Sequence, residues 1–283
     1  MPELPEVETV RRGLATHVIG RRIERVEVGR ERTVRRTSRE ALIHGLSGVS
    51  ITNVYRRGKY LLCSLDSGEV MMIHLRMTGR VLVVPQGTER PPHTHVVLHL
   101  APDATHAAQE LWFVDPRTFG EVVVFDPAST VGVVPELARL GIDPLVDEFT
   151  SELLYGLLHP KRGRLKAVLL DQTVVAGIGN IYADEILHVA RLRPQRVPAR
   201  LSRATIDRLY QAIVEILNSA VDLGGSTLID SQYVDLDGAS GSYQHQHRVY
   251  GRAGETCLSC RSARITQTVV AGRTTCYCPR CQR

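Results

Sequence analysis

The sequence predicts an α+β protein of two domains, in which an N-terminal helix and a β-rich region precede a helical region and a short cysteine-rich module. Three observations support this prediction. Residues 23–125 hold short strand-like runs between turn residues, residues beyond 150 show helical periodicity, and five of the six cysteines lie after residue 256. A length of 283 residues suits two domains of ordinary size.

Residues 1–20 read as a helix. Val7, Val10, Leu14 and Val18 recur at the spacing of one helical face, and Gly20 ends the run. Four apolar runs then follow, at residues 49–55, 60–65, 70–75 and 121–125, with turn signals between them. This pattern is typical of an antiparallel sandwich or barrel. We therefore assign residues 1–132 to an N-terminal β-sandwich domain.

Residues 133–150 read as a linker, and residues 151–245 as a helical domain. Thr150 is a candidate helix cap, and residues 202–223 carry a continuous apolar stripe with Ser202 as cap and two glycines at the end. Residues 226–245 are rich in Ser, Gly, Asp and Gln, so we expect a mobile loop there, and loops of that length are often functional.

The positive charge of the chain is concentrated near its C-terminal end. Residues 246–283 contain seven arginines and one acid, whereas residues 1–245 contain 28 cations and 29 acids. A small basic module on a neutral body suits a surface that binds phosphates. A solvated basic tail is the alternative, and charge alone does not decide between them.

The cysteine spacing predicts a zinc finger in residues 246–283. Cys257 and Cys260 form one Cys-x-x-Cys knuckle, and Cys278 and Cys281 form another beyond the run 261–277. Two such knuckles can hold one tetrahedral ion. Disulfides are the alternative, but they are typical of secreted chains. Cys276 could compete as a ligand, although the spaced pairs fit better.

No run of residues approaches the length of a membrane-spanning helix, and the N-terminal residues lack the pattern of a signal peptide. We therefore expect a protein of the cytoplasm. At this level the sequence indicates a two-domain protein that binds nucleic acid.

Four further motifs carry a resemblance to a known family. They are Met1-Pro-Glu-Leu-Pro-Glu-Val-Glu-Thr9, Ile73-His-Leu-Arg-Met-Thr-Gly79, Asp115-Pro-Arg-Thr-Phe-Gly120 and Val175-Ala-Gly-Ile-Gly-Asn-Ile-Tyr-Ala-Asp-Glu185. In this order, together with the cysteine module, they resemble bacterial formamidopyrimidine-DNA glycosylase, which excises 8-oxoguanine. The resemblance implies a helix-two-turn-helix in the helical domain and a Cys₄ zinc finger with one structural Zn²⁺.

The resemblance implies that Pro2, Glu3 and Lys59 are catalytic. After removal of Met1, the secondary amine of Pro2 attacks the anomeric carbon and forms a Schiff base. Glu3 is the general acid that protonates the opening sugar, and Glu6 supports the site. We interpret Glu8 as an acid favoured near a helix start. Lys59, one of only three lysines, matches a family residue that holds phosphate.

The resemblance also assigns residues that contact DNA. Met77, Arg117 and Phe119 match the side chains that fill the hole left by an extruded base. The alternative for Met77 and Phe119 is a place in the core. Thr118 departs from the family, whose best-known members have arginine there.

Further DNA contacts are implied elsewhere. His74 and Arg273 match phosphate contacts, and Asn180 follows glycines whose amides can approach a phosphate. The loop at 226–242 matches a base-capping loop, although Ile229 stands where relatives often have Lys or Arg. His93 and His95 form a His-x-His pair on an expected strand, where both would share a face; we assign them no ligand role.

We therefore expect a monomeric, nucleoid-associated bacterial enzyme of base excision repair that acts on double-stranded DNA containing an oxidised base. It would excise 8-oxoguanine and formamidopyrimidines as a glycosylase, and then cut the strand as an AP lyase by β,δ-elimination. A rival hypothesis is an endonuclease VIII-type enzyme for oxidised pyrimidines, against which Leu4-Pro5 and the Arg117–Phe119 pair argue. A noncatalytic DNA-damage binder and a zinc-ribbon transcription or translation factor are two more hypotheses.

Overall fold

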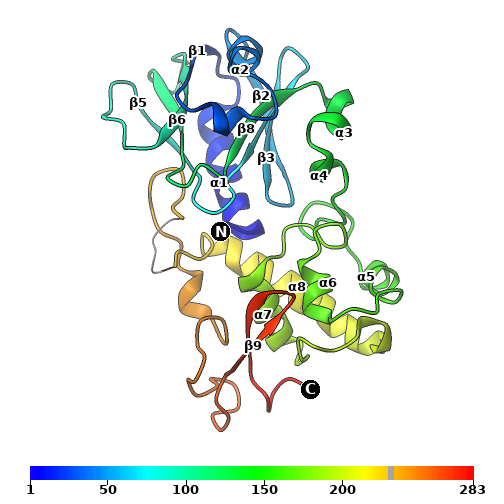
Figure 1. Ribbon diagram of the computed structural model, residues 1–283. Coiled ribbons are helices and arrows are strands. Elements are labelled where there is room, and N and C mark those ends of the chain that lie inside the picture. The colour runs from blue at the N-terminus through cyan, green and yellow to red at the C-terminus, as the bar shows by residue number, and fades with distance from the viewer. Residues whose placement is uncertain (229–232) are drawn as a thin grey trace. The chain divides into compact units, whose positions relative to one another are not determined.

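The computed structural model describes residues 1–228 and 233–283, and Ile229 lies outside these described residues (Figure 1). The chain forms two compact units. Unit 1 comprises Met1–Arg139 and Gly224–Ser242, and unit 2 comprises Leu140–Leu223 and Tyr243–Arg283. The segment Gly224–Ser242 thus groups with unit 1, whereas we predicted residues 226–242 to be part of the helical domain. The reason is its contacts with the first helix, described below.

Unit 1 contains two four-stranded antiparallel sheets, with strand orders β1-β6-β7-β5 and β2-β3-β4-β8. The strands of the first sheet are β1 (Ile23–Val28), β6 (Thr94–Leu100), β7 (Gln109–Val114) and β5 (Arg80–Pro85). Those of the second are β2 (Ile51–Arg57), β3 (Tyr60–Leu65), β4 (Val70–His74) and β8 (Glu121–Phe125). Helices of unit 1 are α1 (Leu4–Val18), α2 (Arg39–Leu46), α3 (Thr130–Val133) and α4 (Pro135–Ala138), with short 3₁₀ helices η1 (Glu31–Val34) and η2 (Pro127–Ser129).

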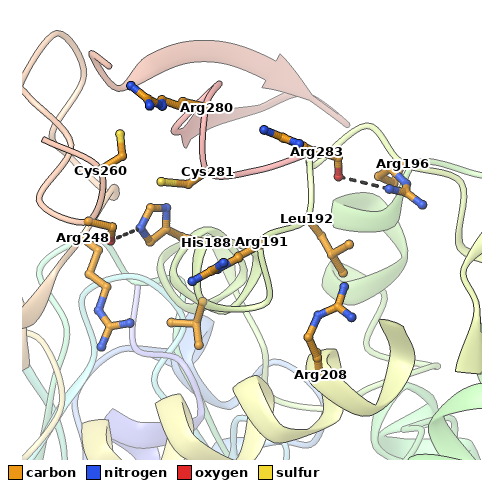
Figure 2. Close-up of a pocket in the computed structure, with 12 residues that line it drawn as sticks. His188, Arg191, Leu192, Arg196, Arg208, Arg248, Cys260, Arg280, Cys281 and Arg283 are labelled. Carbon is orange, nitrogen blue, oxygen red and sulfur yellow. Dashed lines mark hydrogen bonds between the residues drawn. The ribbon is translucent and has the colours of Figure 1, made fainter. Parts of the chain in front are cut away.

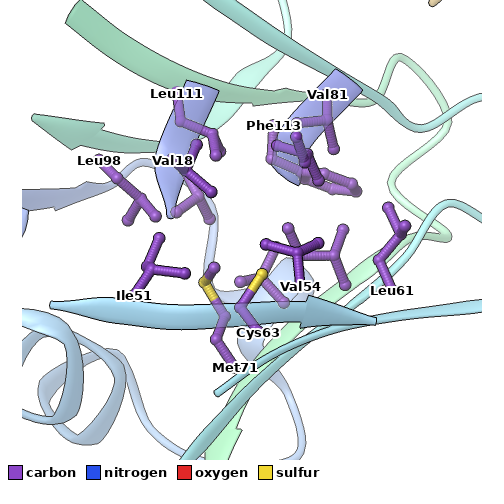
Figure 3. Close-up of a cluster of buried hydrophobic side chains, with 14 of the residues drawn as sticks. Val18, Ile51, Val54, Leu61, Cys63, Met71, Val81, Leu98, Leu111 and Phe113 are labelled. Carbon is purple, nitrogen blue, oxygen red and sulfur yellow. The ribbon is translucent and has the colours of Figure 1, made fainter. Parts of the chain in front are cut away.

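The two sheets pack face to face around one apolar core. Leu98, Leu111 and Phe113 of the first sheet face Ile51 and Met71 of the second (Figure 3). The predicted apolar stripe of α1 enters the same core, because each of its four valine and leucine positions is at most 1% exposed. The architecture is therefore a sandwich rather than a barrel, because two separate four-stranded sheets enclose one core.

Unit 2 is helical apart from one hairpin. Its helices are α5 (Ser151–Leu158), α6 (Leu165–Leu170), α7 (Asn180–Val189) and α8 (Arg203–Asp222), with η3 (Pro198–Arg200) and η4 (Tyr243–Gln246). The predicted caps are present: Thr150 accepts a hydrogen bond from Leu153 N, and Ser202 accepts one from Thr205 N. The hairpin pairs β9 (Thr266–Val270) with β10 (Arg273–Tyr277). The predicted α+β, two-domain class is confirmed.

Within the described ranges, the structure shows no helix that is both long enough and apolar enough to cross a membrane.

Candidate active site and nucleic-acid interface

The start of α1 is held in place by one buried carboxylate. Glu6, which is 1% exposed, accepts hydrogen bonds from Glu3 N at 2.7 Å and from Ser226 N at 2.7 Å. The hydroxyl of Tyr233 also donates to the carbonyl oxygen of Glu6, at 3.4 Å. A buried carboxylate is stable when it is fully hydrogen-bonded. Glu6 therefore fixes both the helix start and the segment that follows Gly224.

Pro2 and Glu3 lead directly into this fixed point. Glu3 is the N-cap of α1 and is 3% exposed, Pro2 is buried, and Met1 is 47% exposed. While Met1 is attached, the nitrogen of Pro2 is part of an amide and has no nucleophilic lone pair. Pro2 can therefore act as an amine only after Met1 has been removed.

The segment after Gly224 has a conformation that requires glycine. Gly225 has φ +76°, and a Cβ there would lie 2.7 Å from Oε1 of Glu6. Farther on, Thr227 accepts from Gly241 N and donates to the Tyr233 carbonyl. We expected a mobile loop over residues 226–245, and residues 229–232 of it lie outside the described residues. Described residues on either side make defined contacts, because they pack on α1.

Lys59 lies in a two-residue turn between β2 and β3. Arg57 pairs with Tyr60 across the turn, and Gly58 has the positive φ that such turns require. Buried Arg56 donates to the carbonyl of Gly58 at 2.8 Å and to Glu8 at 3.2 Å, and Lys59 itself is 8% exposed. Arg56 thereby ties the turn to α1.

Glu8 has a larger role than its place in the first turns of a helix suggests. It is only 9% exposed, and its carboxylate pairs with Arg56, Arg11 and Arg12. Burial acts to raise the pKa of Glu8, but the three arginines outweigh burial and lower it. The interpretation as an acid favoured near a helix start is therefore incomplete, because the partner Arg56 comes from a distant strand.

His74 lies beside Lys59 in the same electrostatic environment. Its ring stacks on that of Tyr60, with centroids 4.4 Å apart. Burial lowers the pKa of His74 well below its usual value, and the charges of Arg76 and Lys59 lower it further. His74 is therefore a neutral imidazole at pH 7, surrounded by cations that favour an incoming anion.

The sheet pairings bring together the loop that carries Met77 and the loop that carries Arg117 and Phe119. We call these the wedge loops, because their side chains are expected to fill the space of an extruded base. His74 pairs with Glu121 in one sheet and Arg80 pairs with Val114 in the other, so residues 75–79 and 115–120 run side by side between the sheets. Buried Asp115 organises both loops: it accepts from the hydroxyl of Thr78 and from Gly120 N at 2.7 Å.

The wedge side chains point to solvent. Met77 is 40% exposed and Phe119 is 37% exposed, although large apolar side chains are usually buried. The guanidinium of Arg117 lies 4.9 Å from the centroid of the Phe119 ring. The alternative that Met77 and Phe119 are core residues is therefore wrong. Thr118 has φ +54°, an uncommon conformation for a β-branched residue.

Glu121 is a site residue that the sequence motifs did not reveal. It is 1% exposed and forms ion pairs with Arg35, Arg36 and Arg76. Burial opposes ionisation, but the three arginines lower its pKa. Glu121 follows the wedge loop directly and so gathers three cations beside it. Only its position after Phe119-Gly120 could have drawn attention to it.

His93 does not lie on a strand with His95, which corrects the sequence prediction. His93 is an exposed turn residue with φ +70°, whereas His95 is buried in β6 and its ring hydrogen-bonds to the carbonyl of Asp115 at 2.9 Å. The strand begins only after His93 because Pro91 and Pro92 precede it and favour a turn. His95 thus supports the wedge loop.

Unit 2 brings Asn180 and Arg273 together. Asn180 is the first residue of α7, and its side-chain amide donates to the carbonyl of Thr274 at 3.0 Å. Arg273 precedes Thr274, is exposed, and follows a tight turn in which Ala271 and Gly272 both have positive φ. The two residues that we expect to bind phosphate, Asn180 and Arg273, are therefore linked through Thr274.

A buried ion pair fixes the hairpin on the helices. Lys166 and Asp184 lie 2.7 Å apart at 0% and 1% side-chain exposure. Lys166 also donates to Thr275, and Asp184 accepts from Cys276 N. Burial raises the pKa of Asp184 to about 7, against the opposing effect of Lys166. The pair positions the strand that carries Arg273.

The four predicted cysteines form a cluster that suits a metal ion. The ligand atoms of Cys257, Cys260, Cys278 and Cys281 all lie within 4.8 Å of one another. Two of the Sγ–Sγ distances are 3.8 Å, which is about the edge of a tetrahedron with metal–sulfur bonds of ~2.3 Å. Cys276 is outside this cluster and packs in the small core beneath it.

Comparison with known proteins decides the family. The model of the formamidopyrimidine-DNA glycosylase N-terminal domain matches residues 1–122, and the model of the H2TH domain of the same enzyme matches residues 140–232. The chain belongs to the formamidopyrimidine-DNA glycosylase family. Proteins of that name from Carboxydothermus hydrogenoformans and Corynebacterium jeikeium are each 42% identical to it, with 100% of both chains covered.

Solved structures of this family are similar over nearly the whole chain. Lactococcus lactis Fpg in complex with DNA containing Fapy-dG has a TM-score of 0.87 at 34% identity, covering 99% of this chain and 100% of that one. The complex of the same protein with abasic-site DNA has a TM-score of 0.88 at 34% identity, covering 99% of each. Fpg of Thermus thermophilus has a TM-score of 0.87 at 40% identity, covering 99% and 98%.

Proposed function

We propose that this chain is a bifunctional DNA glycosylase and AP lyase that excises oxidised purines from double-stranded DNA. The observation that carries the proposal is the full-length match to formamidopyrimidine-DNA glycosylases, among them a protein solved with DNA containing Fapy-dG and with abasic-site DNA. The exposed wedge residues and the buried start of α1 support it from the structure.

In the proposed mechanism Pro2 is the nucleophile. After loss of Met1, its nitrogen attacks C1′ of the damaged nucleotide, and the glycosidic bond breaks with its electron pair leaving on the base. Glu3 donates a proton to the ring oxygen as the sugar opens, and the Pro2 nitrogen loses its proton to give an iminium. Loss of a proton from C2′ then expels the 3′ phosphate, and a second elimination expels the 5′ phosphate.

The remaining residues of unit 1 hold the substrate. Lys59 and His74 would contact the phosphates near the lesion, because both lie within the same group of cations. Met77 and Phe119 would fill the space of the extruded base, and Arg117 would donate to the unpaired partner base. Glu6 keeps the nucleophile in position through its bonds to α1 and to Ser226.

Unit 2 would supply further phosphate contacts and the metal site. We assign Asn180 and Arg273 to phosphates, and one structural Zn²⁺ to the four cysteines, since four thiolates in a closed tetrahedral set favour zinc. Bound zinc would hold the two knuckles together, while the described residues of this unit orient the hairpin. We also propose that the protein acts as a monomer in the bacterial cytoplasm.

Single-turnover excision on two substrates tests this proposal. A duplex with one 8-oxoguanine should be excised and nicked, and a matched duplex with one oxidised pyrimidine should react at least about tenfold more slowly. The undamaged duplex is the control. A preference for the pyrimidine would favour the endonuclease VIII-type hypothesis, and binding without excision would favour the noncatalytic binder.

A further inference from the structure

Unit 2 contains a cavity lined by six arginines to which the proposed function gives no role, and by Cys260 and Cys281 of the candidate metal site. Its volume is about 660 Å³, and it lies among the C-terminal end of α7, helix α8 and the loops that carry Cys260 and Cys281 (Figure 2). Among the described lining residues there is no aspartate or glutamate. The arginines of the lining are Arg191, Arg196, Arg208, Arg248, Arg280 and Arg283.

The cavity is separate from the candidate DNA contacts of the same unit. Asn180 is the first residue of α7, whereas His188, which lines the cavity, lies eight residues later. Eight residues of α-helix span about 12 Å. The cavity therefore lies at the opposite end of α7 from Asn180, and its arginines are not the ones assigned to DNA phosphates.

Negative groups offset only part of the charge of the cavity. In the described part of the chain, the one ion pair that these arginines make with a side-chain carboxylate joins Arg248 to Glu215, at 4.0 Å. Arg196 donates to the main-chain oxygen of Arg283 at 3.2 Å, and the carboxylate of Glu185, which interacts with the charge of Arg248, adds one negative charge. A zinc ion with four thiolates would add two more, and the C-terminal end of α7 about half a charge.

Neutral groups accept the remaining hydrogen bonds of the arginines. Arg208 donates to a carbonyl and Arg280 to a hydroxyl, and Arg193, a further cation beside the lining, donates to the carbonyl of Gln282 at 3.1 Å. With Arg193 counted, seven guanidiniums less the negative groups leave a surplus of between two and three positive charges. Burial lowers the pKa of His188, and the charges of Arg248 and Arg191 lower it further, against a hydrogen bond to Gln282 that raises it.

We propose that this cavity binds an oligophosphate, a chain of three or more linked phosphate groups. One guanidinium group can donate two parallel, charge-assisted hydrogen bonds to two oxygens of a phosphate. The arginines come from different walls of the cavity, so one phosphate cannot reach them all, whereas a linked chain can (Figure 2). Each linked phosphate carries at least one negative charge, so three of them balance the surplus. The shared feature is a row of phosphates: they could belong to a free oligophosphate or to a DNA strand, where deoxyriboses join them.

Calorimetric titration with inorganic tripolyphosphate tests the proposal on the metal-loaded protein. Saturable 1:1 binding is expected, and its affinity should fall at least about tenfold in the Arg191→Gln/Arg208→Gln variant, since each charge-assisted contact contributes strongly. Arg200→Gln removes one charge from an exposed position outside the lining and should change the affinity less than about twofold. Metal content is measured before and after, because oligophosphates chelate zinc.

Three results would overturn the proposal: no saturable binding at about 1 mM tripolyphosphate in low salt, an equal loss in the Arg200→Gln control, or orthophosphate binding as tightly as tripolyphosphate. Competition distinguishes the source of the phosphates. An undamaged duplex that displaces tripolyphosphate identifies a DNA strand as the occupant, and simultaneous binding of both identifies a free oligophosphate. Neither readout depends on glycosylase activity, so failure of this proposal leaves the proposed function intact.

Discussion

Among single residues, Glu6 shows how one side chain can place a reactive end of the chain. Its two carboxylate oxygens accept from Glu3 N and Ser226 N, which come from opposite ends of the sequence. Removing a partner would leave a buried carboxylate unsatisfied, which is costly. The geometry of Pro2 therefore depends on the segment that follows Gly224.

Replacing Gly225 tests this dependence. Gly225→Ala should lower the free energy of unfolding by about 2–3 kcal/mol, because the new Cβ combines a positive φ with a clash against Glu6. Gly238→Ala is the matched control: φ is +81°, but nothing lies within 4 Å of the added Cβ, so only backbone strain of about 1 kcal/mol applies. Urea unfolding measures both. Equal losses would show that the contact with Glu6 contributes nothing.

The pH dependence of DNA affinity tests His74. In the free protein its pKa lies well below the usual value, and contact with a phosphate would raise it. DNA binding then takes up a proton, so affinity should rise as pH falls through the raised pKa of bound His74 towards the lower pKa of the free protein. His74→Gln should flatten this trend, whereas His44→Gln, at an exposed position of α2, should leave it unchanged. The measurement is Kd between pH 5 and 8 with an abasic-site analogue. An unchanged trend in His74→Gln would remove His74 from the phosphate contacts.

Among the elements, the β9–β10 hairpin is a rigid support for one cation. Arg273 directly follows the two-residue turn. The carbonyl of the next residue, Thr274, accepts hydrogen bonds from the side chains of Asn180 and Lys166. The Lys166–Asp184 pair is fully buried, so its loss would leave an uncompensated charge. The hairpin thus holds Arg273 near the first residue of α7.

Arg273→Gln should weaken DNA binding by a similar factor on any sequence. It should also reduce the slope of log Kd against log salt by about one, because one phosphate contact is lost. Arg261→Gln is the control, since Arg261 is exposed in the same finger but away from the hairpin turn. Fluorescence anisotropy at several salt concentrations measures the slope. An unaltered slope would remove Arg273 from the set.

The elements of this fold were predictable where their signal is local. The apolar stripe of α1 follows the helical repeat, and the apolar runs that form β2, β3, β4 and β8 stand between turn signals. Each of these patterns can be read within one short segment of sequence. The contacts of Gly225 and Tyr233 with α1 were not predictable, because they join distant segments. His93 was misplaced for a related reason: the pattern His-x-His fits a strand, but two prolines set the turn.

The residues of the candidate site also fall into those that a local sequence pattern predicts and those that only the fold reveals. Pro2, Glu3 and the four cysteines became candidates through motifs that stand in short runs of sequence, and Lys59 through its rarity and its match to a family residue. Glu121 and the partner of Glu8 were missed, because a buried carboxylate is recognisable only when its arginines have been placed around it. Chemistry-bearing motifs are local, whereas the groups that position them are not.

In the molecule as a whole, the excess positive charge and the candidate metal site lie in the same C-terminal module. Residues 246–283 hold seven arginines and the cysteine cluster, so the module that carries the excess charge has only a small apolar core of its own. A core of that size does not stabilise a fold alone, and a metal ion bound by the four cysteines would supply the missing free energy.

Loss of the metal should therefore affect DNA binding without unfolding unit 1. Cys257→Ser, or chelation, should remove about one metal ion per chain and weaken DNA binding at least about tenfold. Cys276→Ala should retain the metal, because Cys276 lies outside the four-thiol cluster. Metal analysis and anisotropy on the same samples check both. Full affinity without metal would show that the finger is dispensable.

The proposed chemistry depends above all on a covalent bond between the nitrogen of Pro2 and DNA. Borohydride reduction of the protein with a duplex containing 8-oxoguanine, followed by peptide mapping, is the decisive experiment. We expect an adduct on Pro2 in chains that have lost Met1, and none on Pro2 in chains that retain Met1. An adduct mapped to Lys59, or full strand cleavage by chains that retain Met1, would refute this mechanism.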